Sequence, residues 1–181
     1  MVSKNLIAAV VVPLCLAIAS GGALAEDKTR DRPAAEPSDV ESIDAIMAAV
    51  YDVISGDAGE PRDWDRFRSL FIEGARLIPY SAENGPSVLS PEGYIERAGR
   101  FFAEAGFHES EIGRKTERYG NIVHLMSAYE AKRSKSDAEP FLRGVNSFQL
   151  AYHENRWWVV TIYWQAETED NPVPEEYLKQ N

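Results

Sequence analysis

The segment RWWVVTIYWQ, residues 156 to 165, is apolar along nearly its whole length. Successive side chains of a β-strand point to opposite faces, so this segment would present an apolar surface on both sides. Strict alternation places Trp157, Val159, Thr161 and Tyr163 on one face and Trp158, Val160, Ile162 and Trp164 on the other. The chain must therefore cover two faces of one strand, which excludes a sheet with one side left bare to water.

Helical patterns come first along the folded part of the chain. Apolar residues recur at helical spacing after three candidate caps, Ser38, Asp63 and Ser90, and Pro91 suits the first position of the third helix. The predicted helices span residues 38–55, 64–71 and 91–105, and a short strand spans 75–81.

Strand patterns fill the rest of the chain. The predicted strands span residues 108–119, 121–132, 142–152 and 156–165, and the first of them is polar, as a solvent-facing edge strand would be. Pairing Tyr152 with Trp157 across the turn HENR sets Leu150 opposite Val159. This order predicts an α+β fold with three N-terminal helices on one side of a curved, mostly antiparallel sheet.

The N-terminus has the features of an export signal. Lys4 precedes an apolar block from Leu6 to Leu24, and Ala23 and Ala25 occupy the small-residue positions of a cleavage site. A retained transmembrane anchor is the alternative, because the block is nearly long enough to span a bilayer. We expect a signal peptide over 1–25, a flexible charged leader over 26–37, a domain over 38–168 and a tail over 169–181, in a protein that is periplasmic or secreted.

Charge and cysteine content narrow the function. The chain carries 19 basic and 29 acidic residues, and removing a signal that holds one lysine and no acid moves the formal charge from −10 to −11. Such a balance repels phosphate backbones, so no nucleic acid is expected as a partner. The single cysteine, Cys15, lies inside the predicted signal, so the mature chain has no disulfide and must depend on its core; no membrane contact is expected after cleavage.

The chain from about residue 38 to 165 resembles the nuclear-transport-factor-2-like superfamily, which includes ketosteroid isomerase, scytalone dehydratase and SnoaL-type polyketide cyclases. The resemblance lies in the element order and in the segments YGNIVHLMSAYEAK, FLRGVNSFQLAYHENRWWVVTIYWQAE and NPVPEEYL, which look like a secreted, largely uncharacterised branch. It implies a cystatin-like cone with a mixed, strongly curved sheet. The fold hosts enzymes and non-enzymes alike, so it does not name a function.

The resemblance suggests a cover for the second face of the sheet. In many relatives the outer face of the sheet meets a second subunit, so we expect a homodimer through a patch that includes Trp158, Val160, Ile162 and Trp164. The alternative is that the C-terminal segment NPVPEEYL folds back and shields part of this face with Tyr177 and Leu178.

Enzymes of the superfamily place an acidic residue or a histidine inside the cone, where burial raises a carboxyl pKa. No Asp or Glu falls at an inward position in the assumed alternation. The candidate ligand-binding residues are instead Ser127, Tyr129, Asn146, Thr161 and Tyr163, with His124 turned inward only if a bulge reverses the alternation.

Metal and cofactor motifs are absent from the sequence. His108, His124 and His153 stand far apart, and there is no Gly-rich phosphate loop, nucleophile elbow or mature cysteine, so neither a metal nor a cofactor is predicted. Two functions stay open. One is an exported protein whose cone binds a small, mostly apolar molecule or a partner; the other is a SnoaL-like isomerase, dehydratase or cyclase that acts on such a molecule by proton transfer.

Overall fold

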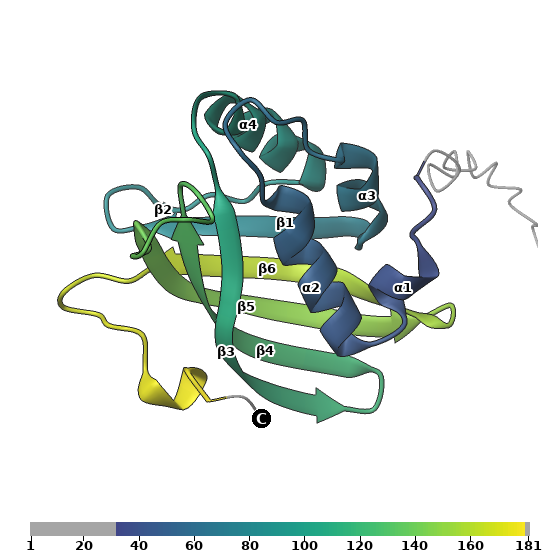
Figure 1. The fold of residues 1–181 in the computed structure, drawn as a ribbon. Helices are drawn as coiled ribbons and strands as arrows, with labels where there is room; N and C mark the ends of the chain where they lie inside the picture. Colours follow the sequence, from purple (N-terminus) through teal and green to yellow (C-terminus); the bar gives the residue numbers. More distant parts are fainter. Residues whose placement is uncertain (1–31, 180–181) are drawn as a thin grey trace, which may run out of the picture. The chain divides into compact units, whose positions relative to one another are not determined.

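The computed structural model describes residues 32–179, which form one compact unit (Figure 1). The order is α1 (Pro37–Val40), α2 (Ile43–Ile54), α3 (Trp64–Ser69), β1 (Phe71–Ser81), β2 (Gly85–Pro86), α4 (Pro91–Glu104), β3 (His108–Tyr119), β4 (Ile122–Lys132), β5 (Leu142–His153), β6 (Arg156–Ala166) and the 3₁₀ helix η2 (Glu175–Tyr177). The predicted signal peptide lies outside the described residues. Within them, no helix is long and apolar enough to cross a membrane.

One six-stranded sheet organises the unit. Its strand order is β2, β1, β6, β5, β4, β3, with β1 parallel to β6 and all other neighbours antiparallel, so the sheet is mixed and mostly antiparallel. The helices pack on one face, and α2 crosses the sheet to contact both β3 and β6 (Figure 1). The predicted α+β class with N-terminal helices on a curved sheet is confirmed.

Two of the three predicted helix caps, Asp63 and Ser90, are confirmed. Asp63 accepts a hydrogen bond from the backbone N–H of Arg66 at the start of α3, and Ser90 accepts one from Gly93 at the start of α4. The first predicted helix is instead divided, because Ser42 takes an extended backbone and caps α2 through the N–H of Ala45. Ser38, the predicted cap, lies inside the short α1.

A bulge in β6 changes which side chains face the helices. Tyr152 pairs with Trp157 and Leu150 with Val159, as predicted, but Gln149 pairs with Thr161, so Val160 is an extra residue. Beyond it the alternation is reversed. Trp157 and Val159 join the core, and so do Ile162 and Trp164 from the predicted outer set. The expected outer patch of four large apolar residues is therefore reduced to Trp158 and Val160.

Two parts of the same chain cover much of that outer face. Trp158 is only 8% exposed, because the guanidinium groups of Arg156 and Arg32 lie 3.6 and 5.5 Å from its ring. Arg32 belongs to the predicted flexible leader, so the end of that segment lies on the domain instead of extending freely. Ala35 from the same segment packs against the core.

The C-terminal tail covers the β3 and β4 side of the sheet, as the alternative to a dimer proposed. The helix η2 contacts both strands, and the N–H of Arg114 donates to the carbonyl of Lys179 at 3.3 Å. A β-carbon at Gly113 would lie 2.5 Å from the carbonyl oxygen of Tyr177, so the tail can approach only because this residue is glycine. The homodimer stays a prediction, and its expected patch is smaller than alternation implied.

Candidate functional site

A cavity of about 190 Å³ lies between the helices and the concave face of the sheet. Most of its wall is apolar and aromatic, which suits a small molecule of similar character. The lining residues are Val50, Tyr51 and Ile54 of α2, Phe67 of α3, Leu77 of β1, Tyr94 of α4, Phe107, Glu109 of β3, Tyr129 of β4, Leu142, Asn146 and Phe148 of β5, and Ile162 and Trp164 of β6.

One carboxyl group, that of Glu109, lies in this apolar wall. Its Oε1 accepts a hydrogen bond from Nδ2 of Asn146 at 3.1 Å. Burial raises the pKa of Glu109 to about 7, while the hydrogen bond from Asn146 acts in the opposite direction by stabilising the carboxylate. A carboxyl group with such a pKa is present in both its acid and its base form at neutral pH.

Two tyrosine hydroxyls accompany Glu109 in the cavity. Tyr94 comes from α4 and Tyr129 from β4, and burial together with the charge of Glu109 raises the pKa of each phenol. Among the residues that the structure describes, neither hydroxyl has a hydrogen-bond partner. Both can therefore donate to a polar atom of a bound molecule.

A third tyrosine, Tyr51 of α2, belongs to a chain of hydrogen bonds. Asn146 donates from Nδ2 to the Tyr51 hydroxyl at 3.1 Å, and that hydroxyl lies 2.7 Å from Oγ of Ser127. Ser127 in turn donates to Oε1 of Glu111 at 2.6 Å. The chain leads from Glu109 in the cavity to a second carboxyl group on the same strand.

The structure brings together only part of the predicted site. Tyr129 and Asn146 line the cavity, and Ser127 lies one hydrogen bond behind the wall, next to Tyr51. Thr161 and Tyr163 follow the β6 bulge and therefore lie on the outer face of the sheet. Thr161 is buried there, and its hydroxyl has no hydrogen-bond partner within residues 32–179.

His124 also lies on the outer face. Its Nε2 is 3.0 Å from Oγ of Ser147, and it lines an outer hollow together with Gln149 and Val160. His124 would face inward only if a bulge reversed the alternation of its own strand. The bulge lies instead in β6, so β4 and the first half of β5 keep the predicted alternation.

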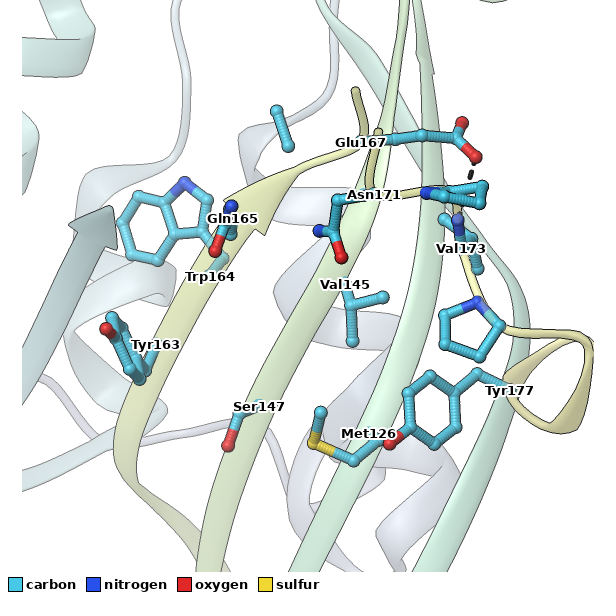
Figure 2. Close-up of a pocket in the computed structure, with 14 residues that line it drawn as sticks. Met126, Val145, Ser147, Tyr163, Trp164, Gln165, Glu167, Asn171, Val173 and Tyr177 are labelled. Atoms are coloured by element: carbon cyan, nitrogen blue, oxygen red, sulfur yellow. Dashed lines mark hydrogen bonds between the residues drawn. The ribbon is translucent and has the colours of Figure 1, made fainter. Parts of the chain in front are cut away.

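A second hollow, of about 270 Å³, lies on the outer face under the C-terminal tail (Figure 2). Figure 2 shows Val145 and Ser147 of β5 and Tyr163 of β6 on one side and Tyr177 of the tail on the other. The N–H of Val173 donates to Oε1 of Glu167 at 2.8 Å, which holds the tail in place. Glu167, the carboxyl group in this wall, is thus already bonded to the tail, and the inner cavity is the better candidate for chemistry.

The residue that sequence reasoning missed is Glu109. The polar character of residues 108–119 led to the prediction of a solvent-facing strand, but Glu109 and Glu111 stand two apart and pair with Ala131 and Tyr129, whose side chains face inward. The available signal was this spacing on a strand next to the inward Ser127 and Tyr129. In residues 32–179 no group of three or more His, Cys, Asp or Glu side chains could hold a metal ion.

Several solved structures with a cystatin-like or nuclear-transport-factor-2-like fold are similar to this chain. A protein of unknown function with a cystatin-like fold from Nostoc punctiforme is 8% identical and has a TM-score of 0.56, over 70% of this chain and 90% of that chain. A nuclear transport factor 2 superfamily protein from Salmonella enterica is 14% identical, with a TM-score of 0.50, over 71% and 87%.

A further similar structure is a protein of unknown function from Silicibacter pomeroyi described as like nuclear transport factor 2. It is 15% identical with a TM-score of 0.50, over 68% of this chain and 92% of that chain. The chain thus has the nuclear-transport-factor-2-like fold that its sequence resembles. No protein-family model matches the sequence, and no curated protein matches it either.

Proposed function

We propose that the protein binds a small, mostly apolar carbonyl compound in the inner cavity and that Glu109 moves a proton to and from the carbon next to the carbonyl group. The observation that carries this proposal is a carboxyl group with a pKa of about 7 in an apolar wall. A buried carboxylate that only supports the fold is commonly paired with a cation, whereas the partner of Glu109 is the neutral amide of Asn146.

The geometry supplies each group that such a proton transfer needs. The ionised carboxylate of Glu109 takes the proton from carbon, and the electron pair of the broken C–H bond moves to the carbonyl oxygen, which becomes an enolate. Hydrogen bonds from Tyr94 and Tyr129 would stabilise that oxygen, because both hydroxyls are free to donate. The carboxylic acid then returns a proton to the same or another carbon, which completes an exchange or an isomerisation.

The experiment that tests the proposal is the exchange of α-hydrogens of small cyclic ketones in deuterated water, followed by NMR. We expect the protein to accelerate exchange of at least one ketone in a panel that begins with cyclohexanone, which the cavity volume of about 190 Å³ can hold. The rate should rise with pH and level off above about pH 7, because only the ionised form of Glu109 accepts the proton.

Glu109→Gln is the decisive variant, since it keeps the hydrogen bond from Asn146 but has no basic oxygen. We expect it to lose the acceleration at every pH. Glu117→Gln serves as the matched control, because Glu117 is an exposed residue of the same strand. Equal exchange by the protein and by Glu109→Gln across the panel, with no small molecule retained by the purified protein in native mass spectrometry, would contradict the proposal.

The alternative is a binding module whose cone is filled by its own side chains. The aromatic residues favour it to some degree: Phe67 stacks on Tyr94 at 5.3 Å, and Tyr94 meets Trp164 at 6.2 Å. These contacts still leave the cavity of about 190 Å³ beside Glu109. A filled cone also gives no reason to bury a carboxyl group without a cationic partner, so the ligand-binding function is the better supported one.

We also propose that the protein is exported and its signal peptide removed. The support for this is the N-terminal sequence, with its apolar block and the residues Ala23 and Ala25 before the predicted cleavage point. We expect the mature protein, expressed with its own N-terminus in a bacterial host and recovered from the periplasm or medium, to begin at Glu26 in N-terminal sequencing. Recovery of the full-length chain from the membrane fraction would show a retained anchor instead.

A further inference from the structure

The hydrogen-bond chain behind Glu109 has only one direction when donors are counted. The side-chain amide of Asn146 has two N–H groups, and these go to the Tyr51 hydroxyl and to Glu109. The oxygen of Tyr51 is therefore an acceptor toward Asn146, and its own proton points to the remaining partner, Oγ of Ser127.

The hydroxyl of Ser127 and the carboxylate of Glu111 form the end of this hydrogen-bond chain. Oγ of Ser127 accepts the proton of Tyr51, so the hydroxyl proton of Ser127 goes to Oε1 of Glu111, at 2.6 Å. An ionised carboxylate can only accept, and it ends the chain with a short, charge-assisted hydrogen bond. Each bond in such a chain polarises the next. The carboxylate of Glu111 therefore favours donation toward itself at every bond, from Asn146 through Tyr51 and Ser127.

We infer that Glu111 is a positioning residue: through Ser127 its carboxylate turns the hydroxyl proton of Tyr51 away from the cavity, so that Tyr51 faces the cavity as a hydrogen-bond acceptor. This inference rests on the proposed function, because it concerns the groups around Glu109. With this arrangement the site has two ends. Hydrogen-bond acceptors lie at the end formed by Glu109 and Tyr51, and hydrogen-bond donors lie at the end formed by Tyr94 and Tyr129.

A protonated or missing Glu111 reverses the chain. A protonated Glu111 can itself donate to Oγ of Ser127, and a missing Glu111 leaves Ser127 without this acceptor. In either case Ser127 can donate back to Tyr51, and the proton of Tyr51 turns into the cavity. That proton would stabilise the ionised form of Glu109, either directly or through a bound molecule. The carboxylate of Glu111 thus keeps a hydrogen-bond donor away from Glu109 and leaves Glu109 the stronger base.

Several charged groups surround the two carboxyl groups. Glu111 lies 3.6 Å from Nε of Arg114, which also pairs with Asp44 of α2. A basin on this side of the molecule is lined by these three residues and by Tyr51 and Glu109 themselves. Its other titratable residues are Asp52, His108, Glu130, Lys132 and Lys135. Burial raises the pKa of Glu111, whereas the hydrogen bond from Ser127 and the charge of Arg114 oppose that shift. Tyr51, Tyr94 and Tyr129 are the titratable groups facing Glu109 in the cavity.

The test is an NMR titration of the side-chain carboxyl carbon of Glu109 in ¹³C-labelled full-length mature protein. In Glu111→Leu we expect the pKa of Glu109 to fall by on the order of one unit, because the proton of Tyr51 becomes free to turn into the cavity. Ser127→Ala interrupts the same chain and leaves both carboxylates in place, so it should lower the pKa of Glu109 in the same direction. Glu130 lies in the same basin but is not part of the hydrogen-bond chain. Glu130→Gln should therefore leave the pKa of Glu109 unchanged.

A double-mutant cycle separates the chain from the charge of Glu111 acting through space. In a Tyr51→Phe background there is no hydroxyl proton to turn, so Glu111→Leu should shift the pKa of Glu109 by less than half as much. An equal shift in both backgrounds, or no shift in either, would overturn the inference. The proposed function is judged separately, by the unmodified protein: titration of Glu109 near the ordinary value of a glutamate would overturn that function.

Discussion

Glu109→Gln is expected to make the folded protein more stable at pH 8, by up to about 3 kcal/mol relative to the unmodified chain. The pKa of Glu109 is raised from 4.5 to about 7 in the folded protein. A raised carboxyl pKa means that folding takes up a proton between these two values. The favourable contribution of the group is therefore complete below about pH 4.5 and is lost as the pH rises through 7.

The measurement is urea unfolding at pH 5 and pH 8 for the protein, Glu109→Gln and the exposed control Glu117→Gln. Glutamine has no charge to bury, so the free energy of unfolding of Glu109→Gln should fall less between the two pH values than that of the other two proteins. A parallel pH dependence in all three would mean that Glu109 titrates normally.

This expectation connects stability with function. A residue that only supports the fold makes the protein less stable when it is replaced. A buried base retained for chemistry does the reverse, because the folded protein must hold a charge in an apolar wall. The sign of the change at pH 8 therefore distinguishes a functional Glu109 from a structural one.

Phe71→Ala is expected to lower the free energy of unfolding by about 4 kcal/mol. Phe71 begins β1, is 1% exposed, and its ring centroid lies 4.6 Å from that of Phe67 in α3. It also pairs with Val159 just before the β6 bulge. Truncation would leave a cavity where the helices, β1 and β6 meet, and neither strand can close it without losing its register.

Urea unfolding of Phe71→Ala at pH 6 measures this cost, with Tyr119→Ala as the control. Tyr119 is an aromatic residue at the β3 hairpin end and is 85% exposed, so its truncation should change stability by no more than about 0.5 kcal/mol. Similar values for the two variants would show that the helix and sheet layers do not share one core at Phe71.

Element type was predictable along most of the chain. The caps at Asp63 and Ser90 and the alternation of β4 and β5 are local signals that the structure leaves intact. Boundaries were less predictable. Phe71 has the spacing of a helical stripe with Phe67, but it begins an 11-residue strand, because pairing with β6 supplies backbone hydrogen bonds that a longer α3 would not.

The candidate site was predictable only where alternation is unbroken. Tyr129 and Asn146 were placed correctly by counting along β4 and β5, whereas Thr161 and Tyr163 were misplaced by the one extra residue at Val160. No sequence pattern marks that bulge, because Val160 is as suitable for a regular strand as its neighbours.

The sequence by itself determined that the chain is an acidic α+β domain whose last strand is apolar on both sides, since composition and periodicity depend on local residue types. Only the tertiary structure decided how those sides are covered, with a bulge turning Ile162 and Trp164 inward and the tail and two arginines covering part of the outer face. It also decided that Glu109 lies in the cavity, because the side of β3 that meets water depends on where α2 packs. That contact joins residues far apart in the chain, and no local pattern encodes it.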